Sequence, residues 1–105
     1  MGFFDFFSAS AKATALYKRG MEKAESGDLI GAIKDYDNVV ANRRCPDDVK
    51  AMALFNRGLA FYLQREFQKA KKDFEVVAGM VKGPAKVVAA AQEKLKRMQS
   101  KADRP

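Results

Sequence analysis

The chain has no histidine, a single cysteine and only three prolines among its 105 residues. Without histidine it lacks the commonest general base of enzymes and the commonest metal ligand of proteins. It also has no Cys-x-x-Cys, no His-Glu-x-x-His, no Gly-x-Ser-x-Gly and no phosphate-binding glycine loop. We therefore expect a protein that is not an enzyme and that uses no cofactor and no metal.

Carboxylates are the remaining candidates for acid–base chemistry. They recur along the chain at Asp35, Asp73, Glu66 and Glu75. We expect these four side chains to lie on exposed helix surfaces, and nothing in their spacing favours a catalytic pair.

The single cysteine and the short apolar runs limit which disulfides, membrane spans and cellular locations are compatible with the sequence. Cys45 has no second cysteine to pair with, which rules out an intramolecular disulfide; we interpret it as a bystander, the alternative being a reactive or dimer-forming thiol. No apolar run is long enough to span a membrane. The start of the chain lacks a basic leader, Asp5 interrupts its apolar stretch, and Phe6 stands where a myristoylation signal requires Ser or Thr. We therefore expect a cytoplasmic protein.

The chain does contain an internal sequence repeat with two copies. Residues 12–20 align with residues 50–58, and the match continues at the same offset to residues 39 and 77. A partial third copy follows, in which Pro84, Val87 and Ala89 match Pro46, Val49 and Ala51. Repetition at this period is typical of stacked helical hairpins, which usually present a binding surface.

The spacing inside each unit is more specific than the period. Both copies carry a glycine, an alanine and an aromatic residue at the same intervals, at Gly20, Ala32 and Tyr36 and at Gly58, Ala70 and Phe74. This pattern resembles the tetratricopeptide repeat, over residues 9–100. The chain departs from that family in three ways. Arginine replaces leucine beside each glycine, Lys23 replaces the first aromatic residue, and the repeat is longer than the family's usual unit of about 34 residues.

Helix-breaking residues predict five helices, with breaks near Gly27, Pro46, Arg65 and Pro84. We expect helices from Ser8 or Ser10 to about residue 25, then over 29–41, from 46 or 47 onward, over 67–81, and from 84 to about 100. The turn at 64–66 has no glycine and should be tighter or more strained than its partner at Gly27. No run alternates apolar and polar residues as a strand would.

These helices predict an all-α fold, a tetratricopeptide-like stack of two helical hairpins plus a C-terminal capping helix; another bundle of five helices is the alternative. The boundaries that we expect are an apolar N-terminal segment at 1–8, repeat one at 9–45, repeat two at 46–83, the capping helix at 84–101 (together a domain at 9–101), and a tail at 102–105.

The resemblance also implies a binding face. In the family, the first helix of each hairpin lines a concave surface, which here would have an apolar, aromatic floor and a basic end. The implied peptide-binding residues are Tyr17, Met21, Phe55, Asn56, Leu59, Tyr62, Lys94 and Arg97. Tyrosine, phenylalanine and methionine suit peptide binding because they offer a large contact area. Some of these side chains instead pack between helices in the alternative interpretation.

One subfamily grips the terminal carboxylate of an acidic peptide with five Lys, Asn and Arg side chains. Asn56 and Lys94 match that set, whereas Tyr17, Met21 and Ala90 replace its other members. The resemblance therefore does not imply that clamp, but a preference for acidic or extended peptides remains.

Two further features keep other functions open. The net charge of +7 is spread over all the predicted helices and is read mostly as solvated surface, although a basic nucleic-acid- or membrane-surface-binding domain is an alternative. The start of the chain carries four phenylalanines, Phe3, Phe4, Phe6 and Phe7. We favour an apolar plug on the first hairpin or a self-association contact over a membrane contact. The sequence thus predicts a non-catalytic protein-interaction module that binds another protein or an extended peptide, with a structural, self-associating homo-oligomer as a further alternative.

Overall fold

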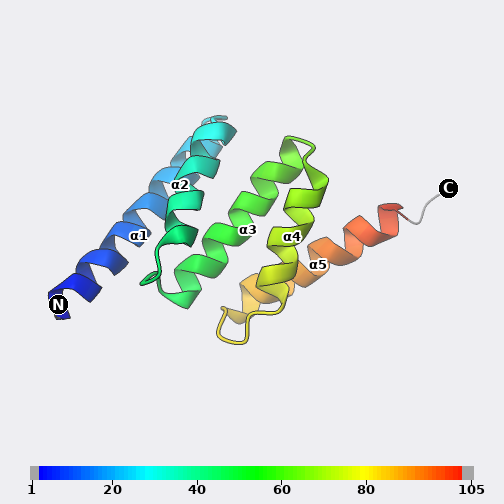
Figure 1. Ribbon diagram of the computed structural model, residues 1–105. Helices are drawn as coiled ribbons and strands as arrows, with labels where there is room; N and C mark the ends of the chain where they lie inside the picture. Colours follow the sequence, from blue (N-terminus) through cyan, green and yellow to red (C-terminus); the bar gives the residue numbers. More distant parts are fainter. Residues whose placement is uncertain (1–2, 103–105) are drawn as a thin grey trace.

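The computed structural model describes the backbone of residues 3–102 and the side chains of residues 8–102. Within residues 3–102 the chain forms five α-helices and no strand, which confirms the predicted all-α stack and its four breaks (Figure 1). The helices are α1 (Phe3–Glu25), α2 (Leu29–Ala41), α3 (Asp47–Leu63), α4 (Phe67–Ala78) and α5 (Ala85–Ala102).

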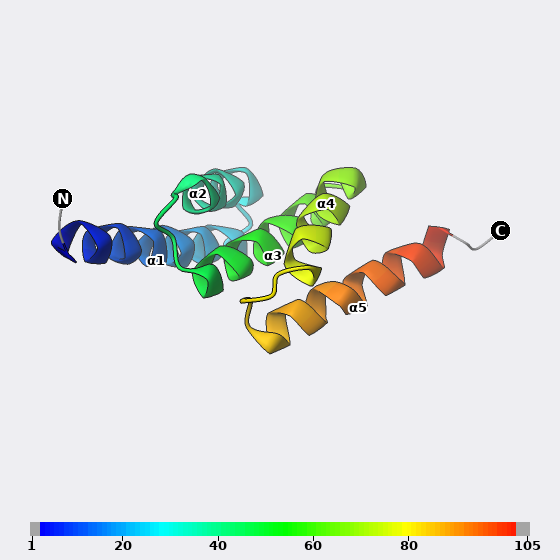
Figure 2. The same cartoon turned by 60° about the horizontal axis from the view of Figure 1, so that its bottom comes forward.

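The helices are arranged in two layers. α1 pairs with α2 and α3 with α4, while α2 also contacts α3, and α4 contacts α5. Figure 2 shows α1, α3 and α5 along one side of the molecule and α2 and α4 along the other. Because α3 touches both α1 and α5, these three helices share one face. The molecule is elongated, measuring 56 × 31 × 18 Å.

Each hairpin closes over a glycine. A Cβ added at Gly20 would lie 2.6 Å from Cε1 of Tyr36, and one added at Gly58 would lie 2.7 Å from Cε1 of Phe74. Only a residue without a side chain leaves room for the aromatic ring at these points. The close helix approach expected from the repeat is therefore confirmed in both copies.

The turns of the two hairpins adopt the same backbone conformation with different residues. Gly27 has φ = 92°, and Arg65, at the matching position of the second hairpin, has φ = 63°. The left-handed region suits glycine but costs an L-residue with a side chain energy. The strain expected at 64–66 is thus present, at Arg65.

Helix α1 begins earlier than the sequence predicted, at Phe3 rather than after Ser8 or Ser10. Ser8 and Ser10 therefore lie inside the helix, where neither can act as the N-cap that was expected, because a capping residue leaves the helical conformation. At its other end, α4 stops at Ala78, before the expected residue 81, because Gly79 ends it. The side chains of Phe3, Phe4, Phe6 and Phe7 lie outside the described side chains, so the interpretations of that segment stay predictions.

Two buried carboxylates correct a sequence-based expectation. Asp35 is 2% exposed and Asp73 is 5% exposed, whereas we had expected both on helix surfaces. Arg19 donates two hydrogen bonds to Asp35, of 2.9 and 2.7 Å, and Arg57 donates two of the same lengths to Asp73. The arginine that replaces leucine beside each glycine thus holds the aspartate that precedes the aromatic residue. Of the other two carboxylates, Glu75 is exposed as expected and Glu66 is half-buried.

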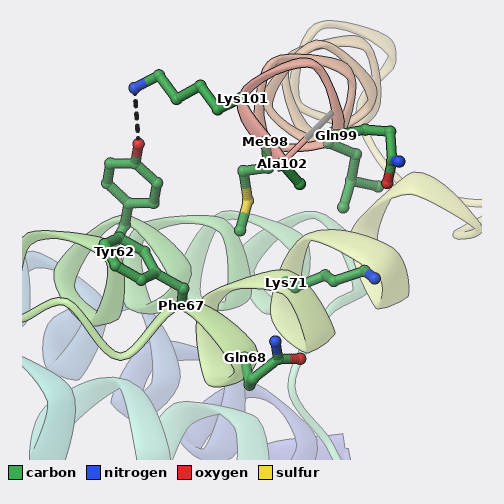
Figure 3. Close-up of a pocket in the computed structure, with 9 residues that line it drawn as sticks. Tyr62, Phe67, Gln68, Lys71, Met98, Gln99, Lys101 and Ala102 are labelled. Atoms are coloured by element: carbon green, nitrogen blue, oxygen red, sulfur yellow. Dashed lines mark hydrogen bonds between the residues drawn. The ribbon is translucent and has the colours of Figure 1, made fainter. Parts of the chain in front are cut away.

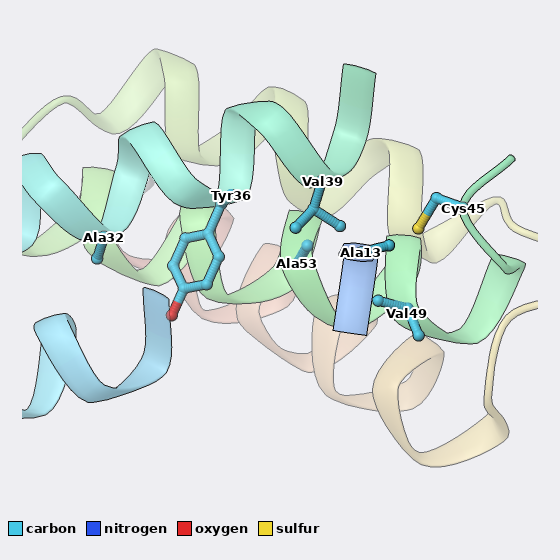
Figure 4. Packing of buried hydrophobic residues seen from close by; sticks show 7 residues of the cluster. All are labelled: Ala13, Ala32, Tyr36, Val39, Cys45, Val49 and Ala53. Carbon is cyan, nitrogen blue, oxygen red and sulfur yellow. The ribbon is translucent and has the colours of Figure 1, made fainter. Parts of the chain in front are cut away.

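The apolar interior consists of two clusters, one between the first hairpin and α3 and one between the second hairpin and α5. Figure 4 shows the first cluster, with Ala13 and Ala53 near Val39 and with Cys45 and Val49 at one end. The second cluster is formed by Leu54, Ala70, Phe74, Val77 and Ala91. Among the described residues, the side chain of Val40 is the one that packs against both clusters.

Helix α5 covers the second hairpin with an apolar stripe and turns a polar face outward. Ala91 is buried, and Leu95 and Met98 pack against the second cluster. Gln92 and Lys96, which are exposed, stand at the positions of the third copy that match the buried Leu54 and Gly58. Because Lys96 carries a long charged side chain where the contact with an aromatic ring requires glycine, α5 cannot close a hairpin at this position as α1 and α3 do.

Candidate functional site

The predicted binding residues divide into a central group and a group at the α5 end. In the centre, the Asn56 amide donates a 2.8 Å hydrogen bond to the Tyr17 hydroxyl, which links α3 to α1. Burial raises the pKa of the Tyr17 phenol, and the hydrogen bond from Asn56 acts in the opposite direction. These two polar groups therefore satisfy each other across the shared face.

Tyr17 and Phe55 occupy matching positions in the repeat and have matching partners. The ring of Tyr17 lies 6.1 Å from that of Tyr36, and the ring of Phe55 lies 5.6 Å from that of Phe74. Both are half-buried, so they support the hairpins as well as lining the shared face. Met21, one turn after Tyr17, is also half-buried.

The other four predicted residues come together around a pocket between α3 and α5. Its volume is about 170 Å³, and its lining residues are Leu59, Tyr62, Phe74, Lys94, Arg97, Met98 and Lys101. Three of these side chains are cationic, and none of the described residues that line the pocket is acidic. Nε of Arg97 lies 3.4 Å from Oε1 of Glu93, and both side chains are exposed on α5. The basic end predicted for this face is therefore present beside an apolar floor.

A larger pocket, of about 360 Å³, opens between the start of α4 and the end of α5 (Figure 3). Its lining residues are Tyr62, Phe67, Gln68, Lys71, Leu95, Met98, Gln99, Lys101 and Ala102. In Figure 3, Met98 points from α5 into this space, with Tyr62 and Phe67 to one side and Lys71 to the other. We call this space the wedge pocket. Tyr62 is the one residue of this lining that the sequence predicted to belong to a site.

The two pockets share a wall formed by Tyr62, Met98 and Lys101. The Lys101 ammonium donates a 3.1 Å hydrogen bond to the Tyr62 hydroxyl and lies 5.7 Å from the centre of its ring. On its other side, the Tyr62 ring meets Phe67 edge-on, at 5.1 Å. Lys101 is exposed, so this contact closes the wall through one solvent-accessible hydrogen bond.

Features that would point to other kinds of site are few in the described part of the chain. No group of three metal-ligating side chains occurs among the described residues. None of the helices over the described range is long and apolar enough to cross a membrane. Cys45 is buried in the turn before α3, and burial raises the pKa of its thiol, which disfavours the reactive thiolate.

No protein-family model, no curated protein and no solved structure matches the chain significantly.

Proposed function

We propose that the chain is a non-catalytic, tetratricopeptide-like protein-interaction module of the cytoplasm. It binds a peptide or protein segment on the face shared by α1, α3 and α5. The glycine, alanine and aromatic spacing of both hairpins, together with their stacking, supports the kinship with tetratricopeptide repeats.

The observation that carries this proposal is the pocket between α3 and α5. Leu59 and Tyr62 supply an apolar floor, while Lys94, Arg97 and Lys101 supply positive charge at its edge. A segment that offers both an apolar side chain and carboxylates complements both features. Helical stacks with such a face are typically binding surfaces.

Paired charge reversals test the proposal. We expect Lys94→Glu with Arg97→Glu to abolish capture of an acidic peptide, because both side chains line the pocket. The matched control is Lys34→Glu with Lys72→Glu, which changes the net charge equally but acts in the α2–α4 layer, where both residues are exposed. Peptide capture by the control variant should equal that of the unaltered protein.

The same variants separate peptide binding from binding to a polyanion. Nucleic acid or an anionic membrane would bind through overall charge, so both double variants would lose binding to the same extent. Binding of such a polyanion to the unaltered protein would also fall steeply as salt is added. Equal losses in both variants, with no peptide captured, would contradict the proposal.

A further inference from the structure

A contact that joins the first hairpin to the second has no counterpart between α4 and α5, where the wedge pocket lies. Arg57 of α3 bonds to Asp37 of α2 at 2.8 Å and so joins the first hairpin to the second. At the matching positions of the next copy stand Leu95 and Glu75. In the part of the chain that the structure describes, no ion pair joins α4 to α5, and Leu95 lines the pocket instead. The junction between the second hairpin and α5 therefore lacks the ion pair that bridges the first junction, and the wedge pocket lies beside it.

The lining of the wedge pocket combines apolar surface with positive charge. Tyr62, Phe67, Leu95 and Met98 form its apolar part, and Lys71 and Lys101 stand at the α4 and α5 sides. None of the described residues that line it carries a negative charge. Phe67 is 40% exposed and so presents accessible aromatic surface to the pocket that it lines.

We propose that the wedge pocket is the anchor site for one bulky apolar side chain of an acidic peptide segment, an inference that rests on the proposed function. The apolar side chain enters between α4 and α5, against Phe67, Leu95 and Met98. Carboxylates beside it in the peptide bind Lys71 and Lys101. Lys101 exchanges its hydrogen bond to the neutral Tyr62 phenol for one to a carboxylate, which is stronger because both partners are charged.

The geometry favours a peptide over two other occupants. A nucleobase binds by stacking on an open aromatic face, but the Tyr62 ring already packs against the ring of Phe67, at 69° to it and with the centroids 5.1 Å apart. A second copy of this chain would bring another net charge of +7 to a basic pocket. An acidic segment removes that repulsion.

A short fluorescent peptide tests the site, with one central phenylalanine flanked by aspartates and glutamates. Ala102→Phe places a ring in the pocket and should weaken binding by at least about tenfold, the loss expected when one buried phenylalanine loses its site. The matched control is Ala89→Phe, at an exposed position of the same helix outside the pocket, which should leave binding unchanged. Lys101→Met should weaken binding about twofold to fivefold, as for an exposed charge pair, and Lys96→Met should not.

Methyl resonances of the methionines report where the peptide binds. Binding in either pocket should shift the Met98 signal, because this side chain lies in their shared wall, and should leave that of Met52, at the first cluster, in place. Ala102 lines only the wedge pocket, so a Met98 shift of unchanged size in the Ala102→Phe variant would overturn the wedge pocket while leaving the proposed function standing. Binding of equal strength to the Ala102→Phe and Ala89→Phe variants would also overturn it, as would equal affinity for a peptide with lysines in place of its acidic residues. If the peptide bound neither pocket and shifted no methionine signal, both proposals would fall.

Discussion

Arg57 holds the Asp73 carboxylate with two parallel hydrogen bonds, 2.9 Å from Nε and 2.7 Å from Nη2. The same guanidinium reaches Asp37 of the preceding hairpin with its third nitrogen. Its two acidic partners raise the pKa of Arg57, with the Asp73 hydrogen bond as the largest cause. One side chain thus closes its own hairpin and joins the two hairpins together.

The two aspartates should contribute unequally to stability. Asp73→Asn should lower the free energy of unfolding by about 1.5–3 kcal/mol, because it removes a charged partner from a buried hydrogen-bonded pair. Asp37→Asn should cost about 0–1 kcal/mol, because the Asp37 side chain is 52% exposed. Urea unfolding of both variants checks this order. Equal losses would mean that the junction contact matters as much as the hairpin contact.

A methyl group at Gly58 should destabilise the second hairpin. Its Cβ would lie 2.7 Å from the Phe74 ring, and overpacking of this kind costs about 1–3 kcal/mol. Gly58→Leu should be worse. The cost of Gly58→Ala should shrink when Phe74→Leu is present, so a double-mutant cycle measures the contact directly.

Gly79→Ala is the matched control for this experiment. An added Cβ there would meet its nearest atom at 3.7 Å, an ordinary contact. If Gly58→Ala melted at the same temperature as Gly79→Ala, the close contact would be disproved.

Substitutions at Gly27 and Arg65, the matching residues of the two turns, should change stability in opposite directions. Gly27→Ala should cost about 1–2 kcal/mol, since the left-handed conformation penalises a Cβ. No atom lies within 4 Å of that added Cβ, so the cost reflects the backbone alone. Arg65→Gly should remove the same strain and raise the melting temperature. Loss of the contact between the Arg65 guanidinium and the Phe67 ring, whose centre lies 5.9 Å away, should reduce this gain. Thermal melts of both variants provide the test, and a lower melting temperature for Arg65→Gly would refute the assignment of strain.

Acid should selectively remove the contribution of Asp35. The hydrogen bonds from Arg19 lower the pKa of this carboxyl, despite the opposing effect of burial. A lowered pKa means that the folded state binds fewer protons, so the contribution is complete above about pH 4, the ordinary value for Asp, and is lost as the pH falls below it. The melting curves of the unaltered protein and of Asp35→Asn should therefore differ at neutral pH and converge in acid. Curves that stay parallel over the whole range would contradict this.

The sequence predicted those parts of the fold that local residues determine. Glycines opposite aromatic residues, recurring at one offset, were enough to pair the helices of each hairpin. The burial of Asp35 and Asp73 was missed because each arginine partner is 16 residues away on another helix. An aspartate within a helix pattern is normally exposed, and only the pairing reverses that.

The site was predicted in part for a similar reason. Leu59, Tyr62, Lys94 and Arg97 followed from the repeat resemblance, and the structure brings them to one pocket. The wedge pocket depends on how α5 lies against α4, which no local pattern specifies. Its one sequence signal was Leu95, which replaces the bridging arginine of the preceding copy.

Val40 has a further consequence for how the molecule unfolds. Since this side chain packs against both apolar clusters, it adds to the coupling that Val49 and Ala53 of α3 provide inside the first cluster. In a linear array, cooperativity depends on such nearest-neighbour coupling. Shortening Val40 to alanine should therefore do more than lower stability. It should weaken the coupling between the hairpins, so that amide hydrogen exchange in α1 and α2 begins to separate from that in α3 and α4.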